Sequence, residues 1–305
     1  MRVLVTGGHG FIGRAACARL AAGHSVRAAS RRSGLDVTRP ETLPPALAGV
    51  EAVVHAAVEG RASIVEGTAN LLAAARAAGV RRFVHLSSVA VYGAAEGAVR
   101  EDTPRAPGDS AYGRWKAEAE ALVEAVTDFE VVILRPALVY GPGDPLWIGR
   151  MARRLALGAL GPLGAAGEGL ADLVHVRDVA EAIALALTGP PGLYNLGGPA
   201  PVTWNEYLAR LAAGLGLAPR PLSPAELAWR ARLALPVKAL ARALPPLAPL
   251  LPAALRESPG AGELALFRRR ARYPWEKAEA ALGWAPRIGL DEGLAESLAA
   301  LRPRE

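Results

Sequence analysis

Short apolar stretches alternate with helical patterns through the first half of the chain, and this alternation limits the possible fold more than any other feature. The apolar stretches occupy residues 2–6, 25–30, 50–57, 82–87 and 130–135. Stretches of helical composition lie between them, as at residues 14–22, 68–78 and 114–126. Strands that alternate with helices form βαβ units, and continuously apolar strands are covered on both faces. We therefore predict a doubly wound parallel sheet of the α/β class.

Glycines stand at positions 7, 10 and 13, where the first strand ends and the first helix begins. Glycine lets the backbone turn tightly and approach a pyrophosphate, which the free N–H groups and the dipole of a helix N-terminus stabilise. An ordinary glycine turn is the alternative. The strand and helix on either side favour a dinucleotide site formed by Gly7, Gly10, Phe11, Ile12 and Gly13.

The alternation weakens after residue 143, where the connections become rich in Pro and Gly. Further strands are expected near residues 173–176 and 193–196, and helices beginning at Thr203, in a capping box with Glu206, and near Pro224. We expect residues 1–160 to form a dinucleotide-binding domain whose sheet is completed by residues 173–198. Residues 161–305 would form mostly a smaller substrate-binding region.

Tyr112 and Lys116 are four residues apart at the start of a predicted helix, and this spacing places both side chains on one face. A buried ammonium beside a phenol favours the phenolate, which lowers the tyrosine pKa toward acid/base chemistry. A surface pair is the alternative, although the chain has only six Tyr and three Lys. Ser87 and Ser88 follow a strand at its carboxyl end, the edge where open α/β sheets bind ligands.

The composition disfavours several classes of protein. Cys17 is the single cysteine and the five histidines form no Cys/His cluster, so neither a disulfide nor a metal site is expected. The N-terminal stretch lacks the long apolar region and the cleavage site of a secretory signal. We expect a cytoplasmic protein.

The net charge of +6 is concentrated in residues 220–305, which hold 14 Lys or Arg against 9 Asp or Glu. Arg268 to Arg270 and Arg272 have no interleaved aromatic residues, so we expect a solvated face or a site for an anionic small molecule, not a nucleic-acid partner. Residues 233–255 contain Lys238, Arg242 and five prolines, so they should not span a bilayer. Two alternatives stay open for them: short amphipathic pieces that form a mobile lid over the substrate, or a helix that completes the domain.

Segments in order along nearly the whole chain resemble the NAD-dependent epimerase/dehydratase group of the extended short-chain dehydrogenase/reductases. They are TGGHGFIG, LSSVAVYG, YGRWK, RPALVYGPGD, DLVHVRDVA and WEKAEAALGWAPRIGLDEGL. The resemblance implies a Rossmann fold. It also implies that Tyr112 is the catalytic acid/base, that Lys116 lowers its pKa and binds the nicotinamide ribose, and that Ser88 hydrogen-bonds the reacting oxygen.

The same resemblance implies further cofactor contacts. Asp36 and Val37 match the pair that contacts adenine, His55, Ala56 and Ala57 the strand end along the cofactor, and Pro136 to Val139 the segment that faces the carboxamide. The chain departs from the family pattern at two places. Val89 and Ala90 replace the acidic pair of sugar-nucleotide dehydratases, which disfavours dehydration, and Ile64 replaces the usual asparagine.

The end of the second strand bears on the choice of cofactor. NAD-selective sites place a carboxylate there, which would repel a 2′-phosphate, whereas this chain has Ser30, Arg31 and Arg32. A hydroxyl and guanidinium groups suit phosphate oxygens, so NADP is predicted, and otherwise NAD. Three observations favour NAD instead. Arginine is so common in the chain that Arg31 and Arg32 can be a chance pair, and the negative charge of Asp36 is near in sequence. The epimerases of the resembled family also mostly use NAD.

The resemblance implies an oxidoreductase or epimerase that transfers hydride at a carbinol or ketone carbon. The substrate would be a sugar nucleotide, which suits the basic C-terminal part, or a hydrophobic alcohol or ketone, which suits residues 233–255. The alternative of another class is a non-catalytic NAD(P)-binding sensor or scaffold. A homodimer stays open.

Overall fold

The structure, a computed structural model, describes residues 1–301. These residues form two compact units. The first contains Met1–Val139, Val174–Pro199 and Tyr273–Ile288, and the second contains Tyr140–Leu173, Ala200–Arg272 and the stretch from residue 289 onward. The first boundary lies at Val139, some way before the predicted residue 160, and residues 273–288 return to the first unit. The predicted roles of the two parts remain predictions.

The first unit is built on a parallel sheet in the order β10-β6-β4-β3-β1-β2. Its strands are β1 (Arg2–Thr6), β2 (Ser25–Ala29), β3 (Ala52–His55), β4 (Arg82–Leu86), β6 (Glu130–Pro136) and β10 (Gly192–Leu196). The predicted fold class is thereby confirmed. The strand order reverses between β1 and β3, and ligands of such sheets bind in the crevice at this point.

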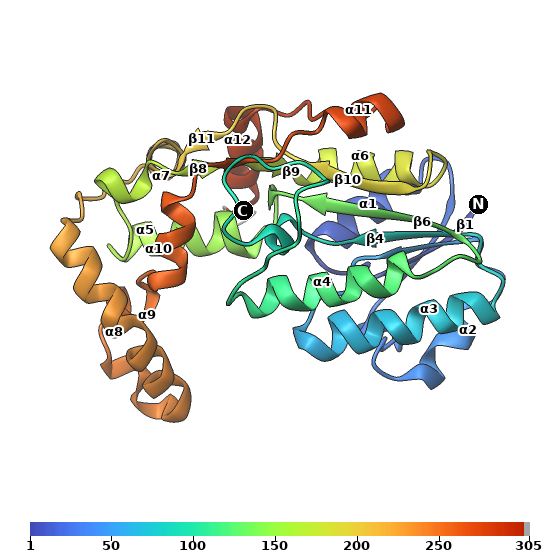
Figure 1. Ribbon diagram of the computed structural model, residues 1–305. Coiled ribbons are helices and arrows are strands. Elements are labelled where there is room, and N and C mark those ends of the chain that lie inside the picture. The colour runs from blue at the N-terminus through green and yellow to red at the C-terminus, as the bar shows by residue number, and fades with distance from the viewer. Residues whose placement is uncertain (302–305) are drawn as a thin grey trace. The chain divides into compact units, whose positions relative to one another are not determined.

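Helices cover both faces of this sheet (Figure 1). One face is covered by α1 (Phe11–Leu20), α6 (Val176–Ala186) and α11 (Glu276–Leu282). The other face is covered by α2 (Leu43–Leu47), α3 (Gly67–Ala77) and α4 (Ala111–Glu124). Helix α1 lies against α6, and α3 lies between α2 and α4. Short elements connect them: η1 (Arg31–Ser33), η2 (Pro40–Thr42), η3 (Ala62–Glu66), η4 (Val89–Tyr92) and β5 (Gly97–Ala98).

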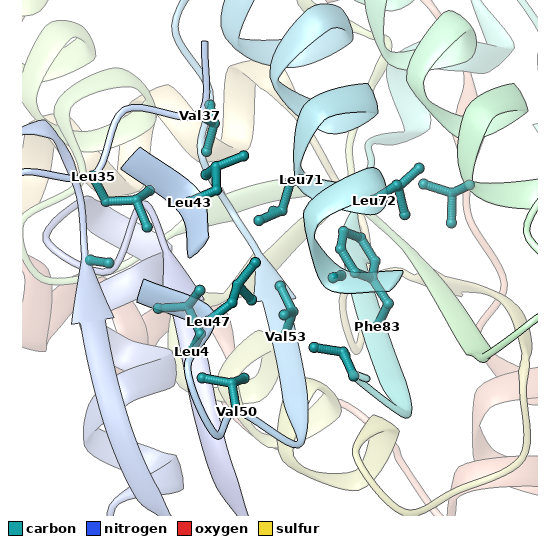
Figure 2. Close-up of a cluster of buried hydrophobic side chains, with 14 of the residues drawn as sticks. Leu4, Leu35, Val37, Leu43, Leu47, Val50, Val53, Leu71, Leu72 and Phe83 are labelled. Atoms are coloured by element: carbon teal, nitrogen blue, oxygen red, sulfur yellow. The ribbon is translucent and has the colours of Figure 1, made fainter. Parts of the chain in front are cut away.

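A hydrophobic core lies between the sheet and helices α2 and α3 (Figure 2). Strands β1, β3 and β4 contribute Leu4, Val53 and Phe83, and the two helices contribute leucines such as Leu47 and Leu71. All five side chains are fully buried. Because burial of such a side chain stabilises the fold by roughly 1.5–3 kcal/mol, this core holds the carboxyl ends of the strands in fixed positions.

The second unit is mostly helical. It contains η5 (Pro145–Arg150), α5 (Met151–Ala156), η6 (Gly164–Gly167), β8 (Leu170–Ala171), β11 (Val202–Thr203), α7 (Trp204–Gly214), α8 (Pro224–Ala243), η7 (Pro245–Leu250), α9 (Ala253–Glu257), α10 (Ala261–Arg268), β12 (Ala271–Arg272) and α12 (Leu290–Leu301). Two short strands contain residues from both units: β7 (Leu138–Tyr140) and β9 (Leu173–His175). Trp204 is fully buried, with its ring 4.5 Å from that of Phe267 and 5.6 Å from that of Trp147.

Two local predictions for this unit have different outcomes. The capping box at the start of α7 is confirmed, since the Glu206 backbone N–H donates to the Thr203 hydroxyl and the Glu206 carboxylate accepts from the Thr203 N–H. The expectation of short pieces in residues 233–255 is wrong for its first half, because α8 continues through Pro236 for 20 residues. The Ala- and Leu-rich sequence around the proline favours the helix strongly enough to offset one lost hydrogen bond. Among the helices of residues 1–301, none has both the length and the apolar character needed to cross a membrane.

Candidate active site

The turn between β1 and α1 can be built only from glycine. Gly7 has a φ of +69°, and a Cβ atom there would lie 2.7 Å from the carbonyl oxygen of Ala56. A Cβ on Gly13 would overlap the carbonyl oxygen of Gly7. The N–H of Gly10 donates to that same oxygen at 2.8 Å, which closes the turn. The chain therefore brings bare backbone to the start of α1.

This backbone forms one wall of a groove of about 500 Å³. Gly10 is the N-cap of α1 and offers no side chain to its first N–H groups, and the first turn holds no acidic residue. A helix N-terminus in this condition attracts an anion such as a pyrophosphate. The groove is lined by Gly7, His9, Gly10, Ser30, Arg31, Arg32, Leu35, Asp36, Val37, Thr38, Ala56, Ala57, Val58, Glu59, Ala62 and Ser63. The residues present thus fit a bound dinucleotide.

Polar side chains meet where the end of β2 borders the groove. The Nδ1 atom of His9 lies 2.9 Å from the hydroxyl oxygen of Ser30. The guanidinium of Arg31 forms an ion pair with Glu59, and both side chains are exposed. Arg32 lines the groove beside them. His9 and Glu59 were not predicted, because only the folded chain brings them to the end of β2.

Asp36 lines the groove, but its carboxylate is bound within its own turn. One oxygen accepts hydrogen bonds from the Thr38 hydroxyl at 2.7 Å and from the Thr38 N–H at 3.0 Å. These bonds lower the pKa of Asp36 below its usual value, so the group is ionised at neutral pH. Val37 is buried against Gly67 and also borders the groove.

Of the three residues predicted to contact the cofactor at the end of β3, two border the groove and one does not. Ala56 and Ala57 line the groove. The His55 side chain is instead buried, with its ring nitrogens 2.7 Å from the Thr6 hydroxyl and 3.0 Å from the Thr68 hydroxyl. Burial, with the nearby charge of Lys116, lowers the pKa of His55 to about 3. The His55 ring is therefore neutral and serves the core.

Ser88 and Tyr112 are brought together by close packing of η4 against the start of α4. A Cβ on Gly113 would lie 2.6 Å from the carbonyl oxygen of Ala90, so only glycine permits this approach. The Ser110 hydroxyl caps α4 by accepting the N–H of Gly113 at 3.1 Å. As a result the Tyr112 phenol is near the Ser88 hydroxyl, whose hydrogen bonding acts to lower the phenol pKa, and Tyr112 remains 38% exposed.

The Lys116 side chain is buried one turn further along α4. Its ammonium donates to the carbonyl oxygen of Leu86 at 2.6 Å, at the end of β4. Burial lowers the pKa of Lys116 to about 8, and the charge of Glu120 opposes this shift. Burial raises the pKa of Tyr112, which the Ser88 bond opposes, so the phenol is protonated at neutral pH. The expected lowering of the Tyr112 pKa by Lys116 is therefore absent from this geometry.

A buried ion pair that was not predicted holds α4 in place. Arg135 in β6 donates to the two carboxylate oxygens of Glu120 at 2.8 and 2.6 Å. The same guanidinium donates to the Tyr92 hydroxyl at 2.7 Å, which donates to Asn195 at 2.8 Å. Because Glu120 is one helical turn from Lys116, this network fixes the position of the lysine. Arg135, a charged residue within the apolar segment 130–136, was the available signal.

The remaining predicted contacts are less directly placed. Phe11 and Ile12 form the first turn of α1, where they contribute backbone N–H groups. Pro136 pairs with Leu196 in the sheet, and Val139 is half-buried. Pro136 and Val139 are not among the residues that line the groove. Within the described part of the chain, no group of three or more His, Cys, Asp or Glu could hold a metal ion.

The chain is similar over nearly its whole length to a 2-alkyl-3-oxoalkanoate reductase of Stenotrophomonas maltophilia. The two are 32% identical, with 96% of this chain and 97% of that protein covered. A 4-hydroxy-2-methyl-3-oxo-4-farnesyl-3,4-dihydroquinoline-1-oxide ketoreductase of Stigmatella aurantiaca is 30% identical, with 71% of this chain and 74% of that protein covered.

The fold and the family are shown by two further similarities. The crystal structure of Thermus thermophilus UDP-glucose 4-epimerase in complex with NAD is 28% identical, covers 98% of both chains and superposes with a TM-score of 0.74. A sequence model of the NAD dependent epimerase/dehydratase family matches residues 3–197. The glycine turn, the parallel sheet and the Ser88–Tyr112–Lys116 arrangement agree with these similarities. This chain therefore belongs to the NAD dependent epimerase/dehydratase family and is an NAD(P)-dependent enzyme of the epimerase and reductase type.

Proposed function

We propose that this chain is a ketone reductase that uses a nicotinamide dinucleotide and acts on a substrate with a large apolar part. The observation that carries the proposal is the placement of the Ser88 and Tyr112 hydroxyls near each other at the carboxyl end of β4, with the buried Lys116 on the same helix. These groups can hold and protonate a carbonyl oxygen at the sheet edge where ligands bind.

Each side chain has a distinct role in this proposal. A bound reduced nicotinamide would supply the hydride to the carbonyl carbon. Tyr112 is protonated at neutral pH, so it can donate its proton to the oxygen as negative charge develops there. Ser88 orients that oxygen through its hydroxyl group. Lys116, held by the carbonyl oxygen of Leu86 one turn further along the helix, would hold the nicotinamide ribose.

Similarity to two ketone reductases supports a hydrophobic ketone as the substrate. Both are at least 30% identical to this chain, and their names describe ketones with alkyl or farnesyl groups. Epimerisation of a sugar nucleotide is the second candidate, supported by similarity to UDP-glucose 4-epimerase over 98% of both chains. Dehydration stays disfavoured, because Val89 and Ala90 provide no acid or base beside Tyr92.

We further propose that the preferred cofactor is NADP. The end of β2 carries Ser30, Arg31 and Arg32 and no carboxylate of its own, and His9 adds a hydrogen-bonding ring nitrogen. The ion pair between Arg31 and Glu59 opposes a 2′-phosphate, but an exposed pair is worth only about 0–1 kcal/mol. A doubly charged phosphate would therefore displace Glu59 from Arg31.

The test begins with the purified enzyme and its bound nucleotide, identified by mass spectrometry after denaturation. NADPH and NADH oxidation are then followed with 3-oxo acids of increasing alkyl length, and UDP-glucose and UDP-galactose are tested for interconversion. We expect NADPH-dependent reduction that strengthens with alkyl length. Interconversion of the UDP-sugars without ketone reduction would favour the epimerase, and nucleotide binding without any turnover would favour the non-catalytic sensor.

A further inference from the structure

Helix α8 carries an exposed apolar face. Trp229, Leu233, Leu240 and Leu244 are separated by four, seven and four residues, which places them on one side of the helix, and each is 43–44% exposed. Leu235 is 71% exposed and lies about 120° around the helix from Trp229. Exposed apolar residues scattered singly are normal, but six of the 13 large ones found within residues 1–301 lie between positions 229 and 250.

The opposite face of α8 is anchored within the second unit. Leu227, Arg230 and Ala234 are buried there. The Arg230 guanidinium donates to the carbonyl oxygen of Gly158, and the Lys238 ammonium donates to that of Ser258, both at 2.8 Å. The chain then turns through η7 and returns, so that α9 lies against α8 (Figure 1). These contacts attach one side of α8 to the second unit, and the side that carries Trp229 is exposed.

The charge around this face has a single sign. Residues 227–256 contain no Asp or Glu and five Lys or Arg. Arg232 and Arg242 are exposed. Arg232 lies next to Trp229 around the helix, whereas Arg242 lies with Leu235 at the other edge of the exposed face. Trp and Leu on one side of a helix, with Arg along the edge, is the arrangement of helices that lie in a lipid–water interface. The tryptophan and the arginine stems can contact acyl chains while their polar ends stay in water.

We propose that α8 and the adjoining η7 form a docking surface for an anionic lipid bilayer. The helix would lie in the headgroup plane, with Trp229 and the leucines inserted and Arg232 and Arg242 against lipid phosphates. Leu250 in η7, 79% exposed, would extend the inserted edge. A second copy of this chain is a poorer occupant, because a symmetric contact would bring the same arginines together. The proposal does not depend on the substrate proposed above.

The experiment is flotation of the full chain with large unilamellar vesicles. One set contains equal parts of phosphatidylcholine and phosphatidylglycerol, and the other contains phosphatidylcholine alone. We expect the protein to float with the anionic vesicles, less with the neutral ones, and less again at high salt, because screening weakens the arginine contribution.

Matched variants separate this surface from general stickiness. Leu233→Glu with Leu240→Glu should weaken vesicle binding by at least about tenfold, because two inserted leucines become charged. Leu301→Glu changes a residue of equal exposure, 43%, at the end of α12 and should bind as the wild type does. Arg232→Gln with Arg242→Gln should remove most of the preference for phosphatidylglycerol. Thermal unfolding checks that each variant is folded.

Three outcomes would overturn the proposal. In the first, the wild type stays unbound to anionic vesicles at low salt, and in the second, the leucine double variant binds as tightly as the wild type. In the third, sedimentation shows a wild-type dimer that the leucine substitutions convert to a monomer, without vesicle binding, and the face is then a contact between copies. Loss of ketone reduction would leave the vesicle result unaffected, so failure of this proposal and of the proposed function are distinguishable.

Discussion

His85 is a buried residue with an uncommon environment. It lies in β4 directly opposite His55 of β3, and neither of its ring nitrogens has a hydrogen-bond partner among the described residues. Burial, with the charge of Lys116, lowers the pKa of His85 well below its usual value. The ring is therefore neutral in the folded chain, while an unfolded chain would take up a proton below about pH 6.5.

This difference predicts acid sensitivity. A histidine with a lowered folded-state pKa loses stability as pH falls below its unfolded value of about 6.5, at up to about 1.4 kcal/mol per pH unit. His85→Leu should keep the free energy of unfolding at pH 7.5 within about 1 kcal/mol and reduce its slope between pH 6 and 4 by about one proton. Urea unfolding at several pH values measures this. An unchanged slope in the variant would show that His85 is already charged or exposed.

The contact between Arg31 and Glu59 gives a pair of opposite predictions for cofactor choice. Arg31→Ala should weaken NADP binding about ten- to a hundredfold and leave NAD binding nearly unchanged, because a charge-assisted hydrogen bond contributes roughly 1.5–3 kcal/mol. Glu59→Gln should tighten NADP binding, since it removes a carboxylate that competes for Arg31. Arg39→Ala, an exposed arginine paired with Glu41, is the control. Equal loss of both nucleotides in Arg31→Ala would contradict the assignment.

Residue roles were predictable where chemistry and sequence spacing coincide. Tyr112 and Lys116 are four apart on one helix, so their common face follows from helical geometry alone. The bond from Lys116 to Leu86 did not follow, because it depends on how closely α4 approaches β4. His55 shows the same limit: its position in the strand was correct, but the pleat turns its ring toward Thr6 and Thr68.

At the scale of elements, the turn from β1 to α1 gives the sharpest prediction. Gly13→Ala would place a methyl group on the Gly7 carbonyl, so the turn must open. We expect nucleotide binding to fall at least about tenfold and the unfolding free energy to fall by about 1–3 kcal/mol. Gly23→Ala, at the end of the same βαβ helix, has no atom within 4 Å of the added methyl and should bind as the wild type does. Isothermal titration with NADP(H) and urea unfolding compare the two.

Strands and helices of the first unit were predictable to within a few residues because their apolar runs are short and the glycines mark the ends. Helix α8 was not, because Pro236 and several charged residues argue for interruption. The local Ala- and Leu-rich sequence outweighs the proline, and contacts far apart in sequence, such as that of Arg230 with Gly158, anchor the helix. The N-terminal caps of α7 and α6 also differ in how clearly the sequence marks them. The box at Thr203 was found because Thr and Glu three residues apart are a common capping pair, whereas His175, whose ring caps α6 by accepting the Arg177 N–H, is not a usual cap residue.

At the scale of the molecule, every residue that lines the groove belongs to the first unit. Nucleotide binding should therefore stabilise that unit by mass action, by about 2.7 kcal/mol when the free nucleotide is a hundred times its dissociation constant. Hydrogen exchange followed by mass spectrometry should show protection at residues 7–13, 30–38 and 56–63. Protection confined to the second unit would place the nucleotide elsewhere.

The division of the chain into two units was harder to predict than the sheet. The boundary at Val139 lies close to residue 143, after which Pro and Gly become frequent, but the return of residues 273–288 depends on which segments pack together and no composition change marks it. Trp284 illustrates the cause, since its indole N–H donates to the carbonyl oxygen of Asp178, more than a hundred residues earlier. Such contacts carry no periodic signal in the sequence.

The central claim is that Tyr112 exchanges the proton of the reacting oxygen. The most direct test compares turnover and nucleotide affinity in Tyr112→Phe, with Tyr194→Phe, which loses only a bond to the Pro190 carbonyl, as the control. We expect Tyr112→Phe to bind NADP(H) within a few fold of the wild type while kcat falls about 10²–10⁴-fold, because only the ionisable oxygen is lost. The control should keep its turnover. Near wild-type turnover in folded Tyr112→Phe would contradict the account.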